Sequence, residues 1–152
     1  MPLRHRLIRC ALALLLAAGG AARADDAADV QALLAGGDAA TALRRVERAV
    51  AARPDDAQLR FLHGVVLMDL RRDEEALTVF TQLAQLYPEL PDPLNNIALL
   101  QARAGRLELA RQALEAALRN DPGHRLARAN LGQVHLMLAV QAWEQAAAGG
   151  PL

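Results

Sequence analysis

The histidine, threonine and cysteine residues of the chain are those best suited to catalysis or metal binding, but they are not spaced to form a catalytic or metal site. His124 and His135 are 11 residues apart, about three helical turns, with no carboxylate between them, so they are too distant to share one metal ion. No threonine lies beside a histidine that could serve as its base; the threonines are Thr41, Thr78 and Thr81. The sequence also lacks a glycine-rich phosphate loop, so we expect neither an enzyme nor a cofactor.

The segment 1–24 has the layout of a secretory signal peptide. A basic start precedes the apolar run over residues 10–18, and Ala22-Arg23-Ala24 has the small-x-small form of a signal peptidase site. The run is short for a membrane anchor, and Cys10 follows an arginine instead of the small residues that precede a lipidated cysteine. We expect cleavage after Ala24 and, from the Ala- and Arg-rich composition, export to a bacterial periplasm with no stable membrane anchor.

The charge balance changes when this leader is set apart. The chain has 17 basic residues, all of them arginine, and 17 acidic residues. Four arginines and no acids lie within the segment 1–24, which leaves 13 against 17, a net charge of −4. Because a mildly acidic domain binds polyanions poorly, we expect no nucleic acid or anionic membrane among its partners. The only cysteine, Cys10, leaves with the leader, so no disulfide or thiol chemistry is expected.

A repeat with a period of about 34 residues organises the rest of the chain. Prolines recur at this spacing, and each follows an alanine by 12 positions: Pro54, Pro88 and Pro122 come after Ala42, Ala76 and Ala110. Such self-similarity is typical of helix–turn–helix arrays. It predicts an all-α, short right-handed solenoid over residues 25–148. The units span about 23–56, 57–90 and 91–124, followed by a partial unit or cap at 125–148 and a tail at 149–152.

The helices within a unit are predicted from apolar spacing. Apolar residues recur every three or four positions over residues 56–70 and again over 76–86, with polar residues between the two stretches. Gly37 and Gly105 mark the corresponding turns of the units on either side, and Asp38 is a natural N-cap for the helix that follows it.

The last unit departs from this pattern. No turn glycine follows its first helix, so that helix is expected to continue to Ala148 and to cap the apolar end of the array. Its predicted inner stripe consists of Leu126, Leu131, Val134 and Leu138. Trp143 is interpreted as a residue packed within the cap. The alternative is an exposed contact, through which two copies of the chain would form a dimer.

The chain resembles the tetratricopeptide repeat family, in an exported bacterial form, over nearly all of residues 25–148. The resemblance rests on a small residue within the first helix of each unit, an alanine and a large residue in the second helix, and a closing proline. These residues are Gly64, Ala98 and Gly132; Ala76 and Ala110; Phe80 and Leu114; and Pro88 and Pro122. Where the family usually has an aromatic residue the chain has Arg60, Leu94 and Arg128, and the first unit has Val30 in place of the small residue.

The resemblance implies a concave groove, lined by the first helix of each unit, that binds a partner segment. The implied partner-binding residues are Gln58, Phe61, Val65, Met68, Asn95, Asn96, Leu99, Arg103, Asn130 and Gln133, with Asp69, Asp92, Ala129 and Met137 beside them. Asn96 and Asn130 occupy the place of an asparagine that often contacts a bound peptide backbone; alternatively, they only cap or solvate the groove. A clamp for an acidic C-terminal tail is not expected, because the chain has no lysine.

The sequence therefore predicts a protein–protein interaction module, a periplasmic adaptor or assembly factor that holds a partner segment in its groove. The mixture of apolar residues and amides favours an amphipathic helix or an extended apolar segment as the ligand. The alternative is an oligomerising structural component of an envelope complex, which would act through Trp143 and the capping helix.

Overall fold

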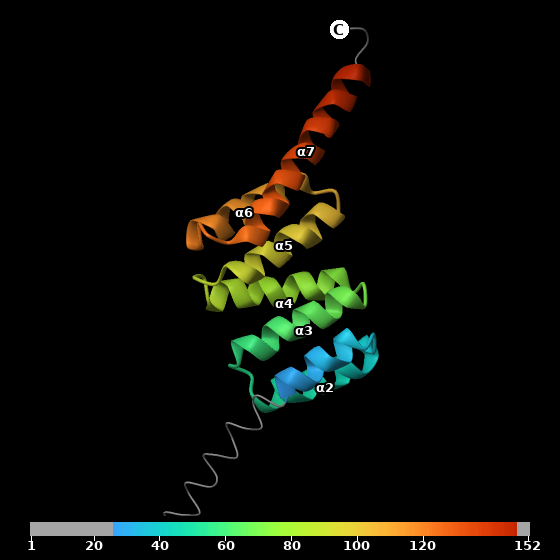
Figure 1. The fold of residues 1–152 in the computed structure, drawn as a ribbon, viewed down its shortest axis with the longest axis vertical. Helices are drawn as coiled ribbons and strands as arrows, with labels where there is room; N and C mark the ends of the chain where they lie inside the picture. The colour runs from blue at the N-terminus through green and yellow to red at the C-terminus, as the bar shows by residue number, and fades with distance from the viewer. Residues whose placement is uncertain (1–25, 149–152) are drawn as a thin grey trace, which may run out of the picture. The chain divides into compact units, whose positions relative to one another are not determined.

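The structure, a computed structural model, describes residues 26–148, and every regular element in that range is helical (Figure 1). A helix over residues 26–35 is followed by α2 (Ala39–Ala52), α3 (Ala57–Asp69), α4 (Asp73–Leu86), α5 (Pro91–Arg103), α6 (Leu107–Asn120) and α7 (Arg125–Ala148). The prediction of an all-α fold that ends in one long helix is confirmed for these residues. The expected leader, residues 1–24, and the tail, residues 149–152, lie outside the described part of the chain.

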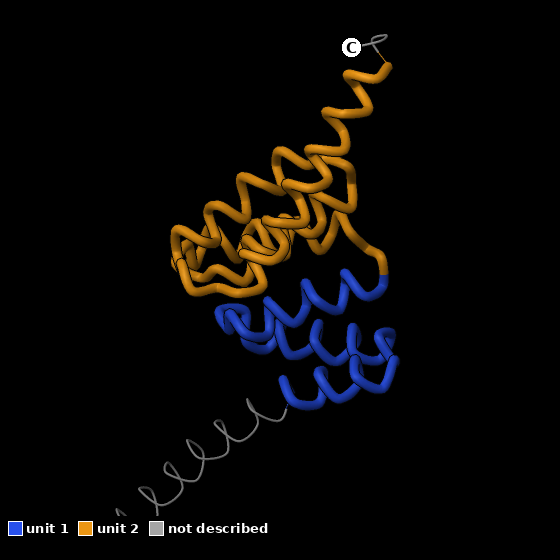
Figure 2. Tube along the Cα trace, turned by 45° about the horizontal axis from the view of Figure 1, so that its top comes forward, with its two compact units in different colours: residues 1–70 blue, residues 71–152 orange. Residues whose placement is uncertain are grey.

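The chain divides into two compact units, which Figure 2 colours separately. The division falls between Leu70 and Arg71, so the first unit holds the 26–35 helix, α2 and α3, and the second holds α4 to α7. No helix within residues 26–148 combines the length and hydrophobicity that a membrane span requires.

The turns between paired helices share one backbone conformation. Gly37 follows the 26–35 helix with a φ of 78°, and Gly105 follows α5 with a φ of 74°. At both turns the next backbone N–H donates to a carbonyl five residues back, from Asp38 to Leu33 and from Arg106 to Gln101, which is the Schellman motif. These bonds satisfy carbonyl groups that the end of a helix would otherwise leave without a partner.

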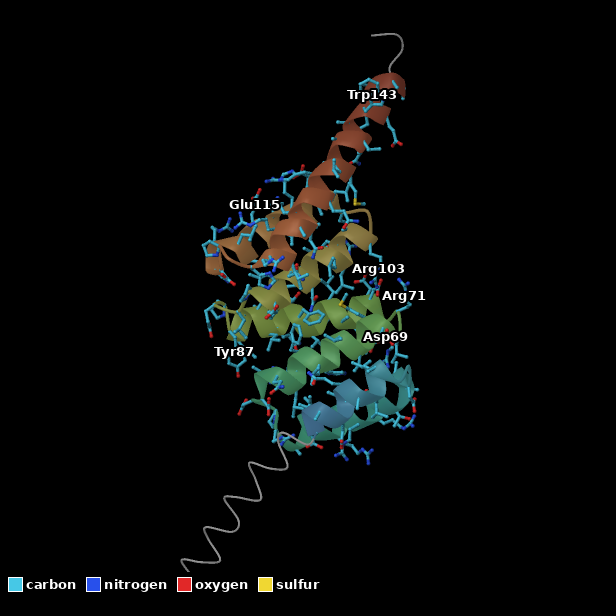
Figure 3. The ribbon with its side chains drawn as sticks, viewed as in Figure 1. Asp69, Arg71, Tyr87, Arg103, Glu115 and Trp143 are labelled. Carbon is cyan, nitrogen blue, oxygen red and sulfur yellow. The ribbon has the colours of Figure 1, made fainter. Side chains whose placement is uncertain are left out.

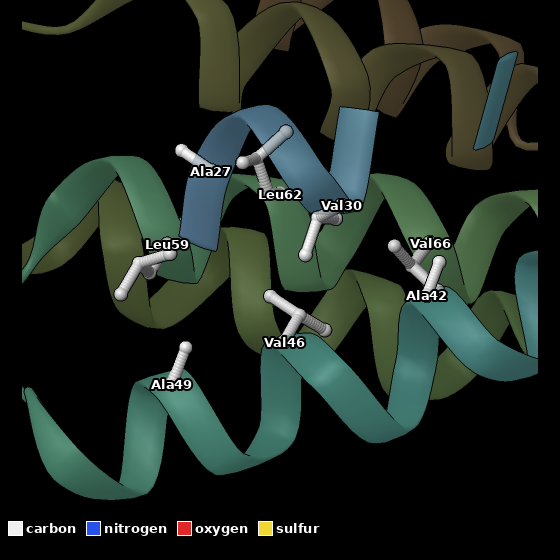
Figure 4. Packing of buried hydrophobic residues seen from close by; sticks show 8 residues of the cluster. All are labelled: Ala27, Val30, Ala42, Val46, Ala49, Leu59, Leu62 and Val66. Carbon is white, nitrogen blue, oxygen red and sulfur yellow. The ribbon is translucent and has the colours of Figure 1, made fainter. Parts of the chain in front are cut away.

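The core of the first unit is a cluster of small and branched apolar side chains (Figure 4). Val30 is fully buried in this cluster, so the 26–35 helix packs on its neighbours although its sequence fits the repeat pattern least well. Outside the cluster, Arg45 and Arg53 pair with Asp26 at 2.9 and 2.6 Å and fix the 26–35 helix to the second helix of the unit. The other buried members are Ala27, Ala42, Val46, Ala49, Leu59, Leu62 and Val66.

In the second unit, α5 packs against α4, α6 and α7, and α6 packs against α7. The buried cluster at the junction of α5, α6 and α7 consists of Ala98, Ala110, Leu114, Ala117, Ala127 and Val134. Four of these six are alanines, which lets the helix backbones approach closely and explains why an alanine-rich sequence forms this fold. The small residues at the predicted positions, Ala98 and Ala110, are at most 1% exposed, as close helix packing requires.

His124 fixes the start of α7. Its Nδ1 accepts a hydrogen bond from the backbone N–H of Ala127 at 3.0 Å, which is the bond an N-cap side chain makes. The Nε2 atom, which then carries the proton, lies 3.0 Å from Oδ1 of Asp92 in the first turn of α5. This histidine, first considered as a possible metal ligand, therefore holds two helices together.

Two packing predictions for α7 are wrong. Trp143 was interpreted as packed within the cap, but it is 71% exposed, because α7 runs on beyond α5 and α6 (Figures 1 and 3). Leu126 was placed on the inner stripe, but it is 66% exposed. Five residues separate it from Leu131, and that spacing turns a side chain about 140° around the helix, away from the buried face.

Candidate partner-binding cleft

A cleft of about 290 Å³ lies in the second unit between the inner sides of α5 and α7. Ala98, Leu114 and Val134 are buried and form its floor. Leu99 and Met137 add apolar surface from the two facing helices. The remaining lining residues are Ala102, Arg103, Asn130 and Gln133, so polar groups surround an apolar floor.

The cleft reflects the repeat register. On α5, Asn96, Leu99 and Arg103 follow one another at three- and four-residue spacing, which places them on one side of the helix. One repeat later, the corresponding residues of α7 are Asn130, Gln133 and Met137. Leu99 and Arg103 of α5 line the cleft together with these three residues of α7, whereas Asn96 belongs to the same row of α5 but does not line the cleft.

Asn130 reaches across from α7 to α5. Its Nδ2 donates a hydrogen bond of 2.8 Å to Oδ1 of Asn95, a side chain that is only 6% exposed. Asn95 was predicted to contact a partner, but it lies below the surface and holds Asn130 in place. Part of the amide of Asn130 is thus used within the protein, and Gln133, which is exposed, has the freer amide at the rim.

Arg103 stands at the C-terminal end of α5, at the edge of the cleft (Figure 3). Its guanidinium is 2.7 Å from Oδ1 of Asp73, in the first turn of α4. The side chains of both residues are about one-third exposed, so water screens the pair and the arginine keeps donors for a ligand. Within the described residues, this is the single basic side chain among those that line the cleft.

The remaining predicted residues lie elsewhere. Gln58, Phe61, Val65 and Met68 belong to α3 in the first unit, where Gln58 is exposed and the other three are half-buried. Asn96 is half-buried on α5 and does not line the cleft. Four lining residues were not predicted to bind a partner, because a floor residue has the same spacing as a core residue: Ala98, Ala102, Leu114 and Val134.

A second groove, of about 480 Å³, runs beside the outer half of α7. It is lined by Gly105 and Leu107 from the turn into α6, and on α7 by Gln133, Leu136, Met137, Val140, Gln141 and Glu144. Leu136 and Val140 are 70% and 57% exposed, so this part of α7 presents large apolar side chains to water.

Comparison with known proteins places the chain in a family. A sequence profile of the tetratricopeptide repeat matches residues 27–91 and 95–151. The chain belongs to the tetratricopeptide repeat family. Arrays of such helical repeats form extended surfaces that bind other proteins, so this chain is a protein–protein interaction module.

Solved structures agree with this assignment. The second tetratricopeptide repeat domain of human RPAP3, in complex with an HSP70 peptide, has a TM-score of 0.66 and 21% identity over 72% of this chain and 92% of that domain. YrrB, a repeat protein with an unusual peptide-binding site, has a TM-score of 0.62 and 28% identity over 64% of this chain and 50% of YrrB. The translocator chaperone SycD of Yersinia enterocolitica, solved as an alternative dimer, has a TM-score of 0.69 and 12% identity over 74% and 91% of the two chains.

Proposed function

We propose that the cleft between α5 and α7 binds a short segment of a partner protein, and that the chain acts as an adaptor or assembly factor. The observation that carries this proposal is the arrangement of the cleft: a buried apolar floor, the side chains of Leu99 and Met137 above it, and Arg103 and Gln133 at the rim. Such a combination of apolar area with a few orienting polar groups is typical of ligand sites.

The chemistry of the cleft favours an extended or amphipathic segment with one apolar side chain directed inward. Its volume of about 290 Å³ is at the small end of ligand pockets, so an anchor side chain fits better than a folded element. The amide of Gln133 both donates and accepts hydrogen bonds, so it can pair with a peptide backbone whatever the sequence of the segment. Arg103 adds a preference for a nearby acidic group.

Relatives with solved structures support this use of the fold. The human RPAP3 domain was solved with an HSP70 peptide, and YrrB is described as having a peptide-binding site. Arg103 is the single basic residue among the described residues that line the cleft, so a ligand here would be held by apolar contact and amides more than by a cluster of basic side chains.

We place this function in a bacterial periplasm. The proposal is supported by the basic start, the apolar run over residues 10–18 and the small-x-small sequence that ends at Ala24. It is tested by N-terminal sequencing of the protein recovered from a periplasmic extract. A chain that begins at Asp25 supports export, and an intact N-terminus in the cytoplasmic fraction contradicts it.

The binding proposal is tested by selecting peptides against the purified protein and measuring their affinity for variants. Leu99→Ala and Gln133→Ala should each weaken binding about tenfold, since each removes a contact worth about 1.4 kcal/mol. The matched control is Gln112→Ala, because Gln112 is exposed on α6 and does not line the cleft. If binding survives both cleft changes but is lost in Gln58→Ala or Met68→Ala, the ligand binds α3 and the cleft is not the site.

A second function, as an oligomerising component of an envelope complex, is favoured by one specific observation. Trp143 is the only tryptophan in the chain and is 71% exposed near the end of α7. Large exposed aromatic side chains are concentrated at protein interfaces.

A further inference from the structure

In the repeat register, the outer half of α7 corresponds to the second helix of a repeat unit, but its sequence lacks the residues that this second helix requires. Ala139 lies one repeat period after Gly105, where a turn would be required, and an alanine does not favour the positive φ that Gly105 adopts. Glu144 lies one repeat period after Ala110, which is fully buried in α6. A carboxylate at that position cannot pack against a neighbouring helix, so the chain continues straight as α7.

The apolar residues of α7 follow a different pattern on its outward side. A stripe of small and large apolar residues recurs at three- and four-residue spacing, and all six are exposed: Ala129, Gly132, Leu136, Val140, Trp143 and Ala147. The buried and half-buried side chains of the same helix, Leu131, Val134 and Leu138, lie about half a turn away. None of the six stripe residues lines the cleft between α5 and α7.

We propose that this stripe is the interface between two copies of the chain, whose α7 helices pair in an antiparallel arrangement. The proposal concerns a different side of α7 from the cleft and does not depend on peptide binding there.

The distribution of side-chain size favours a second copy as the occupant. The side chains of the stripe are small near its start, at Ala129 and Gly132, and large further along, at Val140 and Trp143. With a twofold axis near Leu136, Trp143 of one copy lies opposite Ala129 of the other, and Val140 lies opposite Gly132. A Cβ atom at Gly132 would meet nothing within 4 Å in the single chain, so the space opposite Val140 is open. The stripe is therefore complementary to itself when reversed.

Charge and area favour the same arrangement. Between Leu136 and Ala148 the one charged residue is Glu144, and with the axis near Leu136 it lies opposite Arg128 of the other copy, so the two paired segments do not repel. A stable interface buries roughly 1,200 Å² or more in total, and an aromatic side chain supplies about 150–250 Å² of burial. Trp143, Leu136 and Val140 of both copies, at 57–71% exposure, supply part of that area, and the rest must come from the small and flanking residues of the two paired helices.

Pairing would also support the helix itself. Every residue from Ala139 to Ala148 is exposed, so this stretch has little packing within its own chain. Isolated helical segments shorter than about 12–15 residues are marginal in water, and helices in proteins are held mostly by packing. A second α7 would supply that packing along the whole stripe.

The arrangement is tested with single cysteines in the full chain, in which Cys10→Ser removes the native thiol. Leu136→Cys should form a disulfide between copies, because residue 136 lies at the proposed twofold axis. In Ala147→Cys, which keeps the three large side chains, spin labels should lie about 33 Å apart, since 22 residues at 1.5 Å each separate the two sites along an antiparallel pair. Close labels at 147 would mean a parallel pair and would overturn the proposal.

Sedimentation of the wild-type chain tests dimer formation without any introduced cysteine. Trp143→Ala should weaken the dimer at least about tenfold, because the twofold pairing loses two large aromatic contacts at once. Gly132→Leu should do the same through a clash with Val140 of the other copy, while leaving the single chain folded. Gln145→Ala, an exposed change on another side of α7, is the matched control. A wild-type chain that remains monomeric at about 0.1 mM would contradict the proposal, whether or not the cleft binds peptides.

Discussion

Asn130 Nδ2 donates a hydrogen bond of 2.8 Å to Oδ1 of Asn95, and this bond joins α7 to α5 beneath the cleft. Asn95 is 6% exposed, so its oxygen has little access to water, whereas Asn130 is only half-buried. The two amides are therefore unequal partners. Loss of Asn130 leaves a buried acceptor without this donor, while loss of Asn95 leaves a donor that water can reach.

This asymmetry predicts the outcome of a double-mutant cycle. Asn130→Ala should lower the free energy of unfolding by about 1–3 kcal/mol, because a buried polar group loses its partner. The double change to alanine at both positions should destabilise less than the sum of the single changes, since the two residues interact directly. Urea unfolding at a fixed, low protein concentration measures all three values.

Asn96→Ala is the control for that cycle, because Asn96 is the half-buried neighbour and is expected to change stability by less than about 0.5 kcal/mol. Strict additivity of the two single changes would contradict the hydrogen bond. In binding assays, a loss of peptide binding in Asn130→Ala has two explanations, a lost ligand contact or a disturbed fold, whereas a loss in Gln133→Ala points to the ligand.

Arg71 occupies the turn position that glycine occupies elsewhere in the array. It lies one repeat period after Gly37 and one before Gly105, and it has a φ of 59°, in the left-handed region. An L residue with a side chain is strained there, and glycine is not. Arg71→Gly should therefore raise the free energy of unfolding by about 0.5–1 kcal/mol, after a small offset because glycine increases the conformational entropy of the unfolded chain.

The reverse change tests the same argument. Gly105→Ala should destabilise by about 1 kcal/mol or slightly more, although a Cβ there would meet nothing within 4 Å, because the strain lies in the backbone. Chemical unfolding gives the free energy of unfolding of both variants and shows whether backbone strain determines it. If Arg71→Gly is destabilising, the arginine side chain contributes more to the fold than its backbone strain removes.

How far the sequence predicted this molecule depends on what each residue contacts. The repeat period set the helix boundaries, because turn residues, caps and prolines act locally on the backbone. Trp143 and Leu126 were placed wrongly, because a periodic apolar pattern does not say where the neighbouring helices end. Asn95 was placed on the surface for a similar reason: adjacent positions on a helix differ by about 100°, and only the packed structure shows which asparagine is covered.

Asp38 should make stability depend on pH at the acidic end. Its pKa is lowered by a hydrogen bond with the side chain of Thr41, by the backbone N–H of the same residue and by nearby Arg44. Because the folded pKa lies below the unfolded value of about 3.9, the carboxylate stabilises the fold above that value and loses this effect as pH falls through the folded pKa.

The comparison of Asp38→Asn with wild type isolates this effect. Asparagine is as good an N-cap as aspartate but does not titrate, so the variant keeps the cap at all pH values. Thermal unfolding should show a lower midpoint for the variant near neutral pH, where the charge also favours the helix dipole, and a difference that shrinks below about pH 4. A difference that is constant down to about pH 2 would mean that the ionised form of Asp38 has no role, since at that pH the carboxyl group of the unfolded chain is largely protonated.

The outer part of α7 should be dispensable for the fold of the single chain. Residues 139–148 are exposed, so a chain that ends at Leu138 loses little buried apolar surface. Leu114 of α6 is fully buried, so Leu114→Ala loses much more of it. At low concentration the free energy of unfolding of the shortened chain should lie within about 0.5 kcal/mol of the wild-type value. That of Leu114→Ala should be lower by about 2–5 kcal/mol. At higher concentration only the full chain should gain stability, since association stabilises the state that associates. A large loss from shortening at every concentration would instead mean that α7 packs on its own chain beyond Leu138.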